Sequence, residues 1–175
     1  MKKLVSLLSL ALLSGPAWAA DIEQYVGLDY SWGTFSPEGG RDIDLDGVRI
    51  RYGQYLIPHF GVEAHYIIGT QDGNIIPDTD AGGKLSNKHT ASLFLRGDIG
   101  DTFKLYGLVG WSKSTFEVSG SPGGDSKTNE SDLSYGGGIE YFMSKNTAID
   151  MSYIIYHDEE YFEFSTASLG VTHHF

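Results

Sequence analysis

Hydrophobic and polar residues alternate along most of the chain after residue 20, which is the pattern of β-strands with one apolar and one polar face. The clearest example places Val48, Ile50 and Tyr52 on one face and Arg49 and Arg51 on the other. Turn-forming residues separate the alternating segments, and no sustained helical period interrupts them. The pattern predicts an all-β chain with eight strands, at 24–34, 46–55, 61–71, 89–99, 103–116, 131–142, 147–156 and 162–175.

The connections between these segments indicate on which side of a barrel the apolar faces lie. A soluble β-barrel places apolar side chains inside, whereas a membrane barrel places them outside. The first six connections alternate between long and short, and they cover 35–45, 56–60, 72–88, 100–102, 117–130 and 143–146. Long external loops and short periplasmic turns are typical of bacterial outer-membrane barrels, although the last external connection, 157–161, is short. We therefore predict an eight-stranded antiparallel transmembrane β-barrel in an up-and-down meander.

Several ionisable side chains fall on the polar faces of the strands, and they are Arg49, Arg51, Glu63, His65, Arg96, Asp98, Glu140 and Asp150. On the surface of a soluble protein such charges would simply be solvated. Inside a narrow barrel, four acids would be nearly neutralised by three arginines and one histidine, and nearby glycines would leave room for the long side chains. Buried charges are tolerated when they are paired and hydrogen-bonded. The pattern therefore predicts a charge network that fills the lumen.

Aromatic residues occur on the apolar faces, several of them near the ends of strands, and they are Tyr30, Trp32, Tyr52, Tyr66, Trp111, Tyr135, Tyr141 and Tyr153. In a soluble sandwich these rings would form the core. In a membrane barrel they form the two interfacial girdles, because the ring sits at the level of the headgroups with its polar tip in water.

Residues 1–19 have the features of a cleaved secretory signal peptide. Lys2 and Lys3 supply the positive charge, residues 4–13 are mostly apolar, and Ala17-Trp18-Ala19 fits the small-x-small cleavage rule. The alternative is an uncleaved amphipathic anchor, since an apolar run of this length is too short for a membrane-spanning helix, which needs about 20 residues. We expect one exported barrel domain at 20–175.

The charge of the chain limits its partners. The formal net charge is −11 at pH 7, and it becomes −13 without the two lysines of the leader. The external connections carry −2, −1, −2 and −3 in chain order, which amounts to −8. An acidic exported chain is not suited to nucleic acid, and its outer rim would repel polyanions unless divalent cations bridge the two. The sequence has no cysteine, so no disulfide stabilises the domain.

The chain is similar to the small outer-membrane β-barrel family that includes OmpX, Ail and the membrane domain of OmpA. The similarity rests on the leader, the eight strands, the alternating connection lengths and the final segment "LGVTHHF". In that family the last strand carries alternating apolar residues and ends in an aromatic residue, usually Phe, which the barrel-assembly machinery recognises. The resemblance implies that Leu169, Val171, His173 and Phe175 form this assembly signal, with His173 where a larger apolar or aromatic residue is commoner. It also implies a place in the outer-membrane lipid.

The segment "DIDLDG", at Asp42–Gly47, resembles the start of a calcium-binding loop. The twelfth position of an EF-hand loop should be glutamate, and here it is Gly53, which argues against that motif. Asp42, Asp44 and Asp46 are left as weak candidates for surface binding of Ca²⁺ or Mg²⁺, so divalent cations are possible partners of the external loops.

Enzymatic motifs are absent from the sequence. Outer-membrane lipid deacylases carry a His-x-Ser motif near the C-terminus, and no histidine here is followed by serine at that spacing. The nearest arrangement, His89 and Ser92, puts the two side chains on opposite faces of a strand. His157, beside Asp158 and two glutamates, is expected at a solvated hairpin tip.

The sequence favours a monomeric, non-enzymatic outer-membrane barrel without a cofactor, whose lumen is filled by charges and whose external loops are acidic. Such a protein contributes to envelope structure or to surface interaction. The alternatives are a narrow channel for small solutes and an exported soluble β-barrel that binds a ligand.

Overall fold

The computed structural model describes residues 23–76, 83–120 and 124–175. The long strands are β1 (Gln24–Pro37), β3 (Gly47–Ile57), β4 (Phe60–Gly69), β6 (Lys84–Ile99), β7 (Phe103–Ser119), β8 (Ser126–Phe142), β9 (Thr147–Glu159) and β10 (Phe162–His174), and the short ones are β2 (Ile43–Asp44) and β5 (Gly73–Asn74). Within the described ranges, no helix has the length and apolar character needed to cross a membrane.

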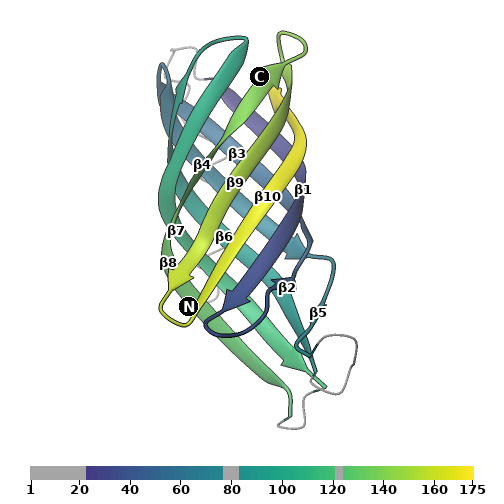
Figure 1. The fold of residues 1–175 in the computed structure, drawn as a ribbon. Coiled ribbons are helices and arrows are strands. Elements are labelled where there is room, and N and C mark those ends of the chain that lie inside the picture. The colour runs from purple at the N-terminus through teal and green to yellow at the C-terminus, as the bar shows by residue number, and fades with distance from the viewer. Residues whose placement is uncertain (1–22, 77–82, 121–123) are drawn as a thin grey trace, which may run out of the picture.

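The eight long strands form a closed antiparallel barrel (Figure 1). Each long strand pairs with the next one along the chain, and β1 also pairs with β10 from Tyr25↔His174 to Pro37↔Phe162. Closure leaves no open sheet edge along this seam, so backbone N–H and C=O groups are satisfied where hydrocarbon would surround the wall. The predicted eight-stranded, up-and-down barrel is confirmed.

Apolar side chains point out of the barrel and charged ones point in. Leu28, Leu93 and Ile99 are 60%, 62% and 66% exposed, whereas Arg49 and Glu63 have no exposed surface. A soluble barrel would have the reverse arrangement, because it buries its apolar face. The alternative of an exported soluble barrel is therefore wrong, and the outward apolar face is suited to lipid.

The two ends of the barrel differ. The short turns 58–59, 100–102 and 143–146 lie at the end where residues 24 and 175 meet (top in Figure 1), and β2 and β5 lie near the other end. We call this second end, which has the longer connections, the outer end. The strands extend further there than their hydrophobic alternation predicts. The β7–β8 pairing, for example, continues to Val118↔Ser126 and shortens the expected connection 117–130. Both faces of these extensions contain polar residues, so alternation does not mark them.

Pairing between β8 and β9 stops earlier than pairing between β7 and β8. It ends at Tyr135↔Ile155, so the outer part of β8 is paired on one side only. Just beyond this point β9 has a bulge, because Ile155 and His157 oppose consecutive residues of β10 and Tyr156 is left between them. A bulge redirects side chains, and here both Tyr156 and His157 are fully buried.

Candidate functional site

The ionisable residues expected on the polar faces lie inside the barrel. Arg49, Arg51, Glu63, Glu140 and Asp150 are fully buried. His65, Arg96 and Asp98 are at most 5% exposed. Together with Asp29, which is also buried, we name these nine residues the ionic layer.

Arg96 of β6 connects carboxylates from three strands. Its Nη1 lies 2.8 Å from Oε2 of Glu63 on β4, and its Nη2 lies 3.0 Å from Oε2 of Glu140 on β8. Its Nε is 3.7 Å from Oδ2 of Asp98 on its own strand. The guanidinium also lies over the ring of Tyr106, 3.9 Å from the centroid, which adds a cation–π contact. One side chain thus links β4, β6 and β8 through the interior.

Asp29 forms a second centre, and it was not among the residues predicted for the charge network. It accepts hydrogen bonds from Nε of Arg49 at 2.9 Å and from Nε and Nη2 of Arg51 at 2.7 and 2.9 Å. Arg51 Nη2 also lies 3.2 Å from Oδ1 of Asp150. Two glycines make room, because a Cβ at Gly27 would lie 2.9 Å from Arg51 and one at Gly170 would lie 2.1 Å from Asp29. The signal was the alternation of strand 24–34, which places Asp29 on the polar face.

Buried tyrosines complete the hydrogen bonding of the ionic layer. Tyr25 donates to Glu63, Tyr55 donates to Asp98, and Tyr106 donates to Asp150 at 2.7 Å. The aromatic residues predicted from the sequence lie at the lipid interfaces, and these luminal hydroxyls were not among them. His174, which also faces the lumen, lies 3.1 Å from Oε1 of Glu140 through its Nε2.

A second group of side chains, which is apolar, fills the lumen near the outer end. Phe35, Phe116 and Phe162 are in mutual ring contact, with centroids 4.9 to 6.0 Å apart. Phe164 lies 5.4 Å from Phe116, and Leu85 belongs to the same buried cluster. We call this group the aromatic layer. Phe35 and Leu85 lie outside the predicted segments, whereas Phe116, Phe162 and Phe164 lie at or near the ends of predicted ones, where the barrel interior is apolar rather than charged.

The aspartates of "DIDLDG" do not gather into one site. Asp42 and Asp44 are exposed, and Asp46 accepts a hydrogen bond from the Tyr30 hydroxyl at 2.8 Å. The segment instead directs Ile43 of β2 and Leu45, which follows β2, into the interior. Among the described residues, a group with metal-ligating geometry occurs elsewhere, at the outer end of β8 and β9.

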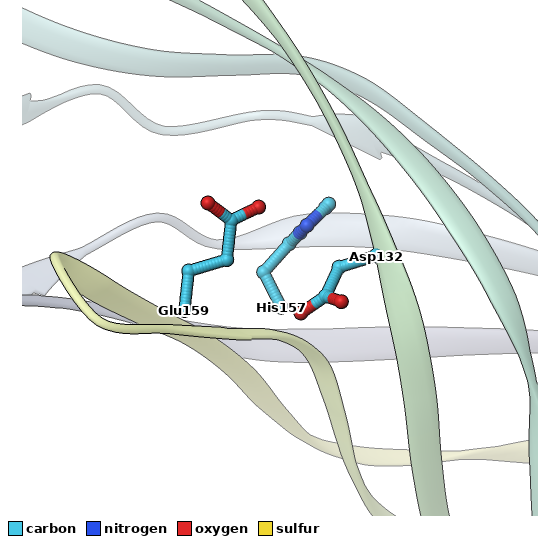
Figure 2. A group of neighbouring side chains, drawn as sticks. All are labelled: Asp132, His157 and Glu159. Carbon is cyan, nitrogen blue, oxygen red and sulfur yellow. The ribbon is translucent and has the colours of Figure 1, made fainter.

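That group consists of Asp132, His157 and Glu159 (Figure 2). His157 was expected at a solvated tip, and this expectation is wrong because the β9 bulge turns its ring inward. Loss of hydration at the outer end of β9, together with the nearby Glu130 and Asp132 carboxylates, raises the pKa of Glu159.

Ser114 and His157 form a hydrogen-bonded pair, with Oγ 2.7 Å from Nε2. A serine beside a histidine resembles the start of a nucleophilic site. Ser114 is fully buried, however, and its Oγ also lies 2.7 Å from Oγ1 of Thr90. Since a nucleophile must reach its substrate, this geometry is not that of an accessible catalytic serine.

The residues assigned to the assembly signal lie on the outer surface of β10 and just after it. Leu169, Val171 and Phe175 are exposed, and the ring of His173 stacks near Phe175 with centroids 6.4 Å apart. Backbone hydrogen bonds join Phe175 to Gln24 in both directions, at 2.9 and 3.2 Å.

A closed barrel with an apolar exterior and a charged interior defines an integral β-barrel membrane protein. Residues 5–175 match the model of the outer membrane protein beta-barrel domain, and the chain belongs to this family. No curated protein sequence matches the chain.

Solved structures share the fold at low sequence identity. The chain is similar to Ail of Yersinia pestis, with a TM-score of 0.67, 19% identity, and coverage of 89% of this chain and 100% of that one. It is also similar to Neisserial surface protein A, with a TM-score of 0.62, 21% identity, and coverage of 86% and 96%. The N-terminal barrel domain of Pseudomonas aeruginosa OprF gives 0.54, 18% identity, and coverage of 85% and 97%.

Proposed function

We propose that this small outer-membrane barrel is a non-enzymatic monomer whose lumen is closed to solutes, and that it contributes to envelope structure with an acidic external surface available for interaction. The observation that carries this proposal is the filling of the lumen by the ionic layer. Arg96 alone joins Glu63 and Glu140 across the interior at 2.8 and 3.0 Å. The aromatic layer, which fills the lumen nearer the outer end, supports the same conclusion.

The proposed route of export and membrane insertion rests on sequence features at the two ends of the chain. Residues 1–19 are proposed to be removed as a signal peptide, and residues 20–175 to form the mature barrel. The barrel-assembly machinery is the proposed partner during insertion, through Leu169, Val171, His173 and Phe175.

The external charge argues against transferring a polyanion-binding role from the structural relatives. Ail has been solved in complex with the heparin analogue sucrose octasulfate. The predicted external connections of this chain sum to −8, so a polyanion would meet charge of its own sign. Interaction with a polyanionic surface would therefore need bridging divalent cations.

Planar-bilayer recording tests the closed lumen against the channel alternative. The wild-type barrel is expected to give no steady single-channel openings, because paired charges occupy the path that ions would take. Folding of the same preparation is verified by the change in gel mobility between unboiled and boiled samples, and insertion is verified by co-flotation of the protein with the lipid vesicles that are fused to the bilayer. Steady openings of the wild type, with a conductance altered in Glu140→Ala, would contradict the proposal and favour a narrow channel.

A further inference from the structure

The outer mouth of the barrel brings together one imidazole and two carboxylates. Asp132 comes from β8, and His157 and Glu159 come from β9. One ligand atom of each residue lies within 4.8 Å of the other two. Figure 2 shows the His157 side chain between the two carboxylates.

The histidine is the observation that distinguishes this group from an ordinary acidic cluster. His157 has no exposed surface, and its Nδ1 has no hydrogen-bond partner among the described residues. A buried polar atom without a partner is costly in a folded protein. Both carboxylates lie within 4.8 Å of one nitrogen of this ring, and the rings of Phe116 and Phe162 pack beside it at 6.1 and 5.8 Å between centroids.

The other ring nitrogen is fixed in the way that metal-binding histidines require. Nε2 lies 2.7 Å from Oγ of Ser114, which lies 2.7 Å from Oγ1 of Thr90. Thr90 can donate in turn to Oδ1 of Asn87 at 3.4 Å. A proton on Nε2 can therefore be donated into this chain, which leaves a lone pair on Nδ1. Histidine ligands commonly have such a hydrogen bond on the nitrogen that does not contact the metal.

Asp132 is held in place beside the histidine. Its Oδ2 accepts the backbone N–H of Asp158 at 2.9 Å, which ties β8 to β9 beyond their last paired residues. Glu159 lies at the outer end of β9 and is the most exposed of the three. Around a tetrahedral ion at about 2.0–2.2 Å, ligand atoms lie roughly 3.3–3.6 Å apart, so a change in the Glu159 rotamer and small shifts of the others would close the site.

We propose that Asp132, His157 and Glu159 bind one divalent transition-metal ion of the Zn²⁺ type at the outer mouth of the barrel. An imidazole nitrogen with two carboxylates suits Zn²⁺ better than Ca²⁺ or Mg²⁺, which prefer sites made of oxygen atoms alone. Three protein ligands leave a fourth position for water or for a group on a partner.

The bound ion would join β8 to β9 where the backbone no longer does so. Their pairing ends at Tyr135↔Ile155, and the site lies further out. A ligand that binds only the folded state stabilises it in proportion to the logarithm of its concentration. This inference does not depend on whether the lumen conducts.

Zinc titration of the untagged, metal-free barrel folded in detergent micelles tests the proposal, with heat measured by calorimetry. The wild type is expected to bind one equivalent of Zn²⁺ and to unfold at a higher temperature in its presence. Glu159→Gln is expected to lower the affinity at least about tenfold. Loss of an outer-shell partner of a metal site already costs about that much, and this substitution removes a direct ligand. This exposed substitution avoids disturbing the barrel interior. His157→Ala is expected to abolish the one-equivalent event.

The matched controls are Glu160→Gln, which removes the same charge one residue further along, and His89→Ala, which removes a histidine outside the group. Both are expected to retain wild-type affinity. A second readout is the ¹⁵N resonance of the His157 ring, which should shift on addition of Zn²⁺. Equal affinity of the wild type and Glu159→Gln, or saturation by Zn²⁺ without a shift of this resonance, would overturn the proposal.

Discussion

Replacing Arg96 by alanine is expected to lower the free energy of unfolding of the barrel by about 3–5 kcal/mol, because removing one member of a buried ion network leaves the others without compensation. Glu63 would lose its nearest guanidinium and keep that of Arg51 at 3.6 Å, and Glu140 would lose its guanidinium partner and keep the His174 ring at 3.1 Å. The side chain also packs on Tyr106, so the loss includes a cation–π contact. Urea titration of the detergent-folded protein, followed by gel mobility of unboiled samples, measures the effect.

The matched control is the surface pair of Lys88 and Glu117, whose side chains lie 3.2 Å apart and are 47% and 38% exposed. Lys88→Ala is expected to change the free energy of unfolding by less than about 1 kcal/mol, since water screens exposed ion pairs. If Arg96→Ala and Lys88→Ala had the same urea midpoint, the ionic layer would contribute no more to stability than an exposed ion pair.

Deleting Phe175 is expected to reduce the amount of folded barrel in the outer membrane several-fold while leaving most of the stability of the refolded protein intact. In detergent the deletion removes two backbone hydrogen bonds to Gln24, each worth about 0.5–1.5 kcal/mol. In the cell it would also remove the aromatic residue proposed as the assembly signal. The heat-modifiable fraction in outer-membrane extracts reports the cellular effect, and urea titration reports the effect in detergent.

Phe103→Ala provides the comparison. Phe103 also faces outward, lies at the same end of the barrel and is 53% exposed, against 59% for Phe175. It is expected to have little effect on abundance. An equal loss of folded protein in both variants would show that an apolar residue at this height, rather than an assembly signal, matters.

Much of the barrel could be predicted from the sequence, because each membrane-crossing strand has one apolar and one polar face. Lipid on one side and a charged lumen on the other impose this contrast. Leu93 and Arg96, on opposite faces of β6, illustrate it. Above the membrane the contrast disappears, since water meets the outer face and the interior becomes apolar. The aromatic layer, with Phe35 and Phe116, therefore was not identified.

The candidate metal group could not be predicted for a different reason. Strict alternation assigns Tyr156 and His157 to opposite faces, but the bulge in β9 places both inside. Residue type does not indicate a bulge here, because its position follows from pairing with β10.

The buried tyrosines that hydrogen-bond to the ionic layer were not predicted for another reason. Tyr25 and Tyr30 are the same residue type on opposite faces of one strand, so residue type does not distinguish a luminal ring from an interfacial one.

The seam between β1 and β10 makes the barrel a ring that has no structural first strand. Gln24 and Phe175 are hydrogen-bonded neighbours, and only residues 160–161 separate β9 from β10. A circular permutant that joins 175 to 24 through a short linker and opens at 160–161 would keep every strand neighbour. Such a molecule should refold in detergent yet present a different last strand to the cell. It would distinguish the sequence features that determine folding of the barrel from those that direct its assembly into the outer membrane.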